Sequence, residues 1–222
     1  MPSAIDISDL EFEYSDGFSL RVDRLKLDPG EQALLCGPSG CGKSTLMNLA
    51  SGLLDASGGS ILISGESITD SSGSQRDAIR GRLIGMVFQT HHLLVGFTAR
   101  ENLEVAMLFS DVPRSEHRSR AEKLLARLQL DRINAPVERL SVGQQQRVAI
   151  ARALASRPKV VLADEPTASL DPSRAEEAMK LLRNAAQAEG AALLVSSHDP
   201  DMPNQFDRVI EWDSLSTFEG AQ

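Results

Sequence analysis

The sequence contains few cysteines and no long apolar run, and each shortage excludes a class of protein. Cys36 and Cys41 are its only cysteines, and they form no CxxC pair with matched histidines, so neither a disulfide framework nor a zinc site is indicated. No apolar run approaches the roughly 18 residues that span a bilayer. Residues 1–9 lack the basic start and apolar stretch of a secretory signal, so we expect a cytoplasmic chain.

The sequence also has fewer positively charged residues than negatively charged ones. The sequence has 23 Lys and Arg residues against 31 Asp and Glu residues, a formal net charge of −8. Because phosphate backbones are bound by clustered positive charge, we expect no nucleic-acid partner. Hydrophobic residues nevertheless make up 41% of the 222 residues, which is typical of an ordinary globular protein of one large domain, or of one domain with an insertion.

Patterns of apolar residues predict an α/β fold with a mainly parallel core sheet. Alternating residues from Ile5 to Leu27 predict an N-terminal antiparallel β region, with a turn at Asp16 and Gly17. A helix is expected between the cap Asp171 and Gly190. Strands are expected at residues 32–36, 60–64, 83–88, 159–163, 191–196 and 208–212. Strands that alternate with helices in this way are typical of parallel sheets.

One segment differs from this alternation. Residues 90–139 contain no strand-like run, and Thr98 and Glu101 form a capping box at the start of a helix. We therefore interpret residues 1–222 as a single domain, with a core of residues 1–89 and 146–222 and an inserted α-helical subdomain of residues 90–145. The Ser/Gly-rich residues 71–74 are expected to form a solvated loop.

The strongest motif lies between a predicted strand and a predicted helix. Residues 37–44 read G-P-S-G-C-G-K-S, which matches the phosphate-binding pattern GxxxxGK(S/T). Backbone N–H groups of such a loop converge on phosphate oxygens, Lys43 reaches the β and γ phosphates, and the Ser44 hydroxyl ligates Mg²⁺. The candidate nucleotide-binding residues are Gly37, Pro38, Ser39, Gly40, Cys41, Gly42, Lys43, Ser44 and Thr45.

A second motif ends another predicted strand. The apolar run that starts at Val160 is followed by Asp164 and Glu165. Asp164 is a candidate ligand in the Mg²⁺ shell, and Glu165 is a candidate for the group that polarises the attacking water. Two acids after a strand are, by themselves, more often a helix cap or a solvated strand end, but their combination with the phosphate-binding pattern favours catalysis.

A third motif points to one family. Residues 140–147 read L-S-V-G-Q-Q-Q-R and resemble the signature motif of ABC-type ATPases, in which glycine stands at the position of Val142. Ser141 and Gln144 form a capping box, so the helix start at Gly143 can bind an anion through its dipole and free amides. The alternative is a helix start without a ligand.

The resemblance extends over nearly the whole chain and implies roles for four more residues. Gln89 matches the glutamine that senses Mg²⁺ and water, and His198 matches the histidine that contacts the γ-phosphate. Asp171 matches the loop that touches the other subunit, and Tyr14 matches the aromatic residue that stacks on adenine. Each has a plainer alternative: Tyr14 as a strand side chain, Asp171 as a helix cap and His198 as a strand-end histidine.

The resemblance to this family implies a P-loop NTPase fold of the ABC type that binds ATP and Mg²⁺. It also implies a homodimer, or paired cassette, around two ATP molecules that drives a separate integral membrane permease. Such a subunit is soluble when isolated and lies on the cytoplasmic face of the inner or plasma membrane. Residues 86–94 and 97–102 look most like the lipoprotein-release and macrolide-exporter branch. The alternatives are a mechanical regulator resembling the cell-division complex, and a soluble ABC ATPase that acts on nucleic acid.

Two further features concern single side chains. His91 and His92 could suggest a metal pair, but adjacent side chains diverge and no further ligands are near in sequence, so we expect both to be exposed. Cys41 lies inside the phosphate-binding pattern. The helix N-terminus and Lys43 would lower the pKa of its thiol, whereas burial would make it inert.

Overall fold

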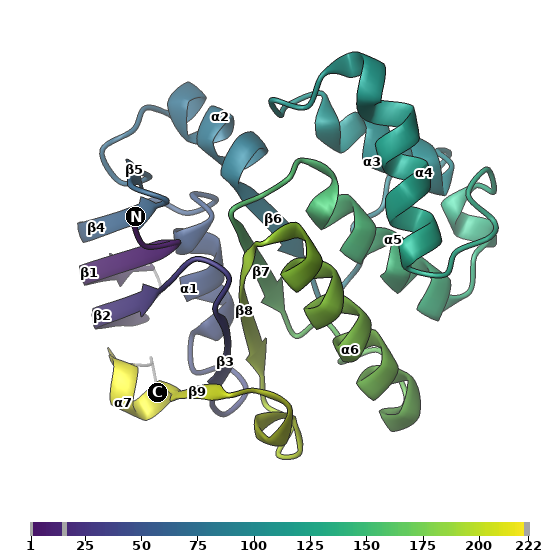
Figure 1. The fold of residues 1–222 in the computed structure, drawn as a ribbon. Helices are drawn as coiled ribbons and strands as arrows, with labels where there is room; N and C mark the ends of the chain where they lie inside the picture. The colour runs from purple at the N-terminus through teal and green to yellow at the C-terminus, as the bar shows by residue number, and fades with distance from the viewer. Residues whose placement is uncertain (1, 15–16, 220–222) are drawn as a thin grey trace.

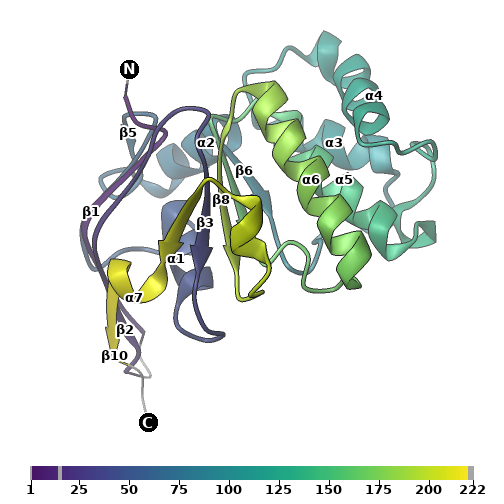
Figure 2. The same ribbon diagram turned by 60° about the horizontal axis from the view of Figure 1, so that its bottom comes forward.

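An antiparallel sheet forms one side of the molecule in the computed structural model, which describes residues 2–14 and 17–219. Its order is β10-β2-β1-β4-β5, and β10 joins the edge beside β2 (Figure 2). The predicted pairing of the first two strands is confirmed, although Asp16 of the predicted turn lies outside the described residues. The strands are β1 (Ile5–Glu13), β2 (Ser19–Leu27), β4 (Gly58–Ile63), β5 (Glu66–Ser67) and β10 (Ser216–Glu219).

The second sheet is parallel, as predicted, with the order β6-β7-β8-β3-β9. Its strands are β6 (Ile84–Val87), β7 (Val160–Asp164), β8 (Ala192–Ser197), β3 (Gln32–Cys36) and β9 (Arg208–Glu211). Trp212, expected at the end of the last strand, instead begins the short helix α7 (Trp212–Leu215). Because the strands are parallel, the residues that follow β3 and β7 lie at the same edge of the sheet, and both nucleotide motifs meet there.

The parallel sheet is buried on both faces. In β7, Val160 and Leu162 pack into a core shared with α1 (Lys43–Ala50) and the antiparallel sheet. Val161 and Ala163 face the opposite core, which contains α5 (Val142–Ala155) and α6 (Pro172–Glu189). Figure 1 shows α1 between the two sheets and α6 on the far side of the parallel sheet. Strand residues therefore alternate between two hydrophobic cores.

Helix α2 (Gly73–Leu83) was not predicted. Residues 71–74 were expected to form a solvated loop, but Ser72 is the N-cap of α2, with a capping box to Gln75. The helix lies at the surface and buries only Ile79 and Leu83, so its sequence carries too few apolar residues for a periodic signal. The apolar run after the phosphate-binding pattern predicts a helix over residues 45–54, but α1 begins at Lys43 and ends at Ala50.

Helices α3 (Ala99–Met107) and α4 (His117–Arg127) lie beyond α5, away from both sheets (Figure 1). The predicted capping box is confirmed, since the Thr98 side chain accepts a hydrogen bond from the Glu101 amide. The expected boundary at residue 145 falls within α5, which runs without a break. Short 3-10 helices occupy Arg114–Glu116, Val137–Arg139 and Met202–Gln205. Among the described helices, none combines the length and apolar character needed to cross a bilayer.

Candidate active site

The phosphate loop, residues 37–44, connects β3 to α1 and holds its lysine inward. The Lys43 side chain is 5% exposed, and its Nζ atom donates hydrogen bonds to the carbonyl oxygens of Gly37 at 2.7 Å and Pro38 at 2.8 Å. Gly42 is the N-cap of α1 and supplies no side-chain cap. The first backbone N–H groups of a helix have no partner within that helix, so this end of α1 is suited to bind an anion.

Two aromatic side chains pack closely against the loop. A Cβ atom added at Gly42 would lie 3.0 Å from Phe18 Cζ and 3.1 Å from Trp212 Cζ2, and one added at Gly37 would lie 2.6 Å from Trp212 Cβ. Trp212 is 1% exposed and is the only tryptophan in the sequence. The loop can therefore follow this path only with glycine at both positions.

We expect Gly42→Ala to lower the free energy of unfolding by about 2 kcal/mol, a fall in Tm of roughly 4–8 °C. Gly42 has φ of +112°, which L residues rarely adopt, and the added methyl group would crowd both rings. Thermal unfolding followed by circular dichroism measures the change. Gly73→Ala is the control, because Gly73 lies in the first turn of α2 with nothing within 4 Å, and it should leave Tm unchanged or raise it.

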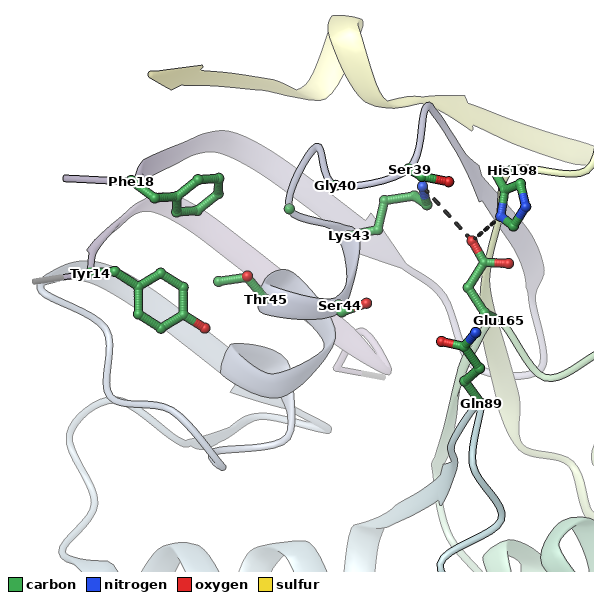
Figure 3. Close-up of a pocket in the computed structure, with 11 residues that line it drawn as sticks. Tyr14, Phe18, Ser39, Gly40, Lys43, Ser44, Thr45, Gln89, Glu165 and His198 are labelled. Atoms are coloured by element: carbon green, nitrogen blue, oxygen red, sulfur yellow. Dashed lines mark hydrogen bonds and ion pairs between the residues drawn. The ribbon is translucent and has the colours of Figure 1, made fainter. Parts of the chain in front are cut away.

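A pocket of about 510 Å³ opens above this loop. Ten residues singled out from the sequence meet there, although they come from distant parts of the chain (Figure 3). The pocket is lined by Tyr14, Phe18, Ser39, Gly40, Gly42, Lys43, Ser44, Thr45, Gln89, Glu165 and His198. Of these, only Phe18 was missed. It lies across the hairpin from Tyr14. Two aromatic residues on either side of a predicted turn could therefore have indicated, from the sequence, that Phe18 belongs to the same site.

The catalytic candidate Glu165 lies at the centre of a small polar network. Its Oε1 atom is 2.7 Å from His198 Nδ1 and 3.9 Å from Lys43 Nζ, and its side chain is 14% exposed (Figure 3). The backbone at Glu165 has φ of +45°, an uncommon conformation for a residue other than glycine. The turn after β7 thus directs this carboxylate toward the lysine and the histidine.

Ser196 of β8 orders the two acids. Its hydroxyl donates to Asp164 Oδ1 at 2.6 Å and accepts a hydrogen bond from the Glu165 amide at 3.1 Å. Ser196 is fully buried, and β7 and β8 pair Asp164 directly with it. Sequence reasoning assigned no role to Ser196, because the contact depends on strand register.

Aromatic side chains line the other end of the pocket. The Tyr14 and Phe18 ring centroids are 5.8 Å apart, and Phe12 meets Tyr14 edge-on at 4.6 Å. Tyr14 is 36% exposed, so it is not a side chain buried in the core. Figure 3 shows both pocket rings facing the start of α1 at the end opposite Glu165. This arrangement offers a flat apolar surface next to a phosphate-binding loop.

The signature residues lie elsewhere. Ser141, Gly143 and Gln144 line a separate hollow of about 300 Å³ between α5 and α6, and none of the three lines the pocket that contains Lys43. Ser141 caps α5 through the predicted capping box with Gln144. Val142 is 49% exposed at the first turn of the helix. Within one chain, therefore, the signature is not brought to the phosphate loop.

The structure can also be compared with what the sequence predicted for Asp171, Cys41 and His91. Asp171 caps α6, and hydrogen bonds from the Ser173 hydroxyl and the Arg174 amide lower the pKa of its carboxyl. Of the two alternatives for Cys41, the structure favours the inert thiol, because burial raises the pKa of the thiol. The expectation that both histidines are exposed is wrong for His91. Its Nε2 atom is buried, and burial lowers the pKa of its imidazole.

Comparisons with known proteins agree on one family. Residues 20–168 match the family described as ABC transporter. The lipoprotein-releasing system ATP-binding protein LolD of Maricaulis maris is 45% identical over 192 residues, which cover 86% of this chain and 84% of that protein.

Two solved structures share the fold. A dimeric structure of the ATP-binding cassette MJ0796 in a post-hydrolysis state, bound to ADP and Pi, is 31% identical with a TM-score of 0.79 and covers 98% of this chain and 99% of its own. The structure of cbiO1 from Clostridium perfringens, described as part of the ABC transporter complex cbiONQ, is 33% identical with a TM-score of 0.84. It covers 95% of this chain and 85% of its own.

Proposed function

This chain belongs to the ABC transporter family as an ATPase, and we propose that it drives a separate membrane permease of the lipoprotein-releasing kind. In this proposal the core is residues 1–89 and 146–222, and residues 90–145 form the helical subdomain. The chain acts at the cytoplasmic face of the membrane through its permease. The long match to a lipoprotein-releasing ATP-binding protein supports this branch.

The pocket residues divide the work on ATP. Tyr14, with Phe18 beside it, stacks on the adenine, and the phosphate loop holds the phosphates while Lys43 neutralises charge on the β and γ groups. Glu165 accepts the proton of the attacking water, as its position next to the phosphate loop permits. His198, which is within hydrogen-bonding distance of Glu165, contacts the γ-phosphate.

Mg²⁺ fits the residues at this edge of the sheet. Ser44 and Gln89 line the pocket and Asp164 precedes Glu165 at the end of β7, so all three candidates offer the oxygen donors that this ion prefers. Bound Mg²⁺ supplies charge neutralisation on the phosphates. The hydroxyl of Ser196 orients the Asp164 carboxylate for this task.

Dimerisation completes each site in the proposal. Ser141 and Lys43 line separate hollows in one chain, so a second copy is the means by which a signature reaches a bound nucleotide. Asp171 lies in the adjoining loop and is exposed, so it can contact the partner as well as cap α6. The dimeric structure of the MJ0796 cassette supports this arrangement.

We infer the membrane partner from an apolar groove next to the active site, which we take as the surface where the permease docks. It has a volume of about 510 Å³ and lies where β6 and α2 of the core meet α3 and α5. Arg152 in this groove binds only backbone carbonyls in the described part of the chain, and burial lowers the pKa of its guanidinium. The groove includes the apolar residues Leu53, Ile84, Met86, Phe88, Ala106 and Phe109.

We expect the free chain to hydrolyse ATP slowly and its cognate permease in detergent to stimulate it, because coupling through a docking surface needs a partner on that surface. Phe109→Glu should abolish the stimulation and leave basal hydrolysis unchanged, since Phe109 lines the groove and is 70% exposed. Steady-state ATPase assays with and without the permease measure both quantities.

Leu108→Glu is the matched control, because Leu108 is 51% exposed but does not line the groove. It should keep the stimulation. Full turnover by the free chain, unchanged on addition of permease, would instead indicate a stand-alone ATPase. Equal stimulation of the Phe109 and Leu108 variants would place the permease elsewhere on the surface.

A further inference from the structure

The C-terminal part of the chain passes next to the phosphate loop. Strands β3 and β9 are parallel neighbours, and Cys36 at the end of β3 pairs with Glu211 at the end of β9. The residues that follow, Gly37 of the loop and Trp212 of α7, therefore leave the sheet side by side. After α7 the chain forms β10, which pairs with β2 of the antiparallel sheet (Figure 2). This segment thus connects the two sheets beside the loop.

Trp212 lies against both ends of the loop. A Cβ atom added at Gly37, where the loop begins, would lie 2.6 Å from Trp212 Cβ and 3.3 Å from its Cγ. One added at Gly42, the N-cap of α1, would lie 3.1 Å from Cζ2 and 3.6 Å from Cη2, at the far edge of the indole ring. Opposite ends of one rigid side chain therefore meet opposite ends of the loop.

The indole ring is itself held in place. Trp212 is 1% exposed and belongs to the hydrophobic core that also contains Leu46 and Met47 of α1. Phe18 packs against the same core, and its Cζ atom would lie 3.0 Å from a Cβ atom added at Gly42. A ring fixed in this way restricts the movement of the loop end that supplies the first free amides of α1.

The composition of the loop makes such a contact valuable for binding. Gly40 and Gly42 have φ of +78° and +112°, and Gly37 is a third glycine among the eight loop residues. Glycine loses more conformational freedom than any other residue when it becomes ordered. If ATP had to order this loop, the entropy lost would reduce the affinity, whereas a loop that is already ordered avoids this cost.

We propose that Trp212 is a positioning residue that holds the phosphate loop in its nucleotide-binding shape before the nucleotide arrives, and thereby sets the affinity for the phosphates. Trp212 does not line the nucleotide pocket, so it acts through Gly37 and Gly42. The role rests on the proposed function, in which this loop holds the phosphates of Mg-ATP. A tryptophan that only filled the core would affect the free energy of unfolding but not the affinity of the folded chain.

The test uses Trp212→Leu, which keeps the Cβ and Cγ atoms next to Gly37 and removes the ring edge next to Gly42. We expect calorimetry to show that Mg-ATP and Mg-ADP each bind about 10-fold more weakly, because both nucleotides place a β-phosphate on the loop. In steady-state assays KM should rise with kcat within about twofold, because the ground state and the transition state lose the same support. Calorimetry replaces fluorescence here, since Trp212 is the only tryptophan in the sequence.

Two more variants separate positioning from stability. Trp212→Phe keeps a shorter ring and should weaken Mg-ATP binding by only about threefold, and it carries the test if Trp212→Leu does not fold. Leu215→Ala is the matched control. Leu215 is 8% exposed in the same short helix and the same core, but it is not among the atoms nearest to Gly37 or Gly42. Its loss should lower Tm with Mg-ATP affinity within about twofold, measured well below the Tm of each protein.

A double-mutant cycle tests the contact between Trp212 and Gly42 without nucleotide. Gly42→Ala should lower Tm less in the Trp212→Leu protein than in the unchanged protein, because the added methyl group no longer meets the indole ring. Thermal unfolding of the four proteins gives the two differences. Equal differences would show that the two residues do not interact, and would reject the proposal.

Two results of the binding experiments would also overturn it: unchanged Mg-ATP affinity in the Trp212→Leu protein, or an equal loss of affinity in the Leu215→Ala protein. Failure of the proposed function gives a different result. The unchanged protein would then bind no Mg-ATP at all, and the role of Trp212 would be rejected together with the function.

Discussion

We expect Glu165→Gln to lower ATP turnover by at least about 100-fold while Mg-ATP binding is retained, because the amide keeps the shape of the carboxylate but cannot accept a proton. The position of Glu165 between Lys43 and His198 makes it the best-placed base in the pocket. Removal of its negative charge also relieves repulsion with the γ-phosphate. The variant should therefore accumulate as an ATP-dependent dimer.

Size-exclusion chromatography with light scattering measures the dimer, and phosphate release measures turnover. Glu189→Gln is a matched control, since the Glu189 side chain is 12% exposed, close to the 14% of Glu165, but pairs with Arg120 and Arg127 far from the pocket. It should leave turnover unchanged. A Glu165→Gln protein that stays monomeric with ATP well above its binding constant would contradict the proposed dimer.

The second large effect is expected for Lys43→Ala, which should weaken Mg-ATP binding by at least about 10-fold because the charge that faces the β and γ phosphates is lost. Trp212 packs against Gly37 and Gly42, so its fluorescence provides a signal for binding that needs no label. Calorimetry gives the dissociation constants. Equal ATP affinity of the two proteins would overturn the assignment of the phosphate loop.

A mixing experiment extends this prediction to the signature. Ser141→Arg places a bulky cation at the start of α5 and should abolish the dimer trapped by Glu165→Gln. A Lys43→Ala chain mixed with a Ser141→Arg chain can still form one site in which both contributing motifs are intact. Some ATP-dependent association should return in that mixture and in neither variant alone. If Ser141→Arg leaves the trapped dimer intact, the signature does not act across the interface.

Local patterns were sufficient to predict most of the fold and the individual site residues. The run from Gln32 to Cys36 stops at glycine, and the helix after it begins within the motif, so the strand, loop and helix could be placed from sequence alone. Capping boxes at Thr98 and Ser141 were visible for the same reason, since each depends on residues three apart. These features are determined over a few residues.

Features that depend on distant contacts could not be predicted. The exposure of His91 was misjudged because its ring is covered by α5, more than fifty residues later in the chain. Ser196 received no role because its contact with Asp164 requires the register of β7 and β8. Helix α2 was missed because the segment is mostly polar. Its only buried residues are Ile79 and Leu83, and the packing of these two side chains stabilises the helix.

The alternation of β7 between two cores has a consequence for how this protein can evolve. Val160 and Leu162 face one core, and Val161 and Ala163 face the other. Substitution of one apolar residue by another of similar size changes only local packing. Insertion or deletion of a single residue would exchange the two faces and displace Asp164 and Glu165 from the pocket edge. Lineages of this protein can therefore vary the composition of β7 but not its length.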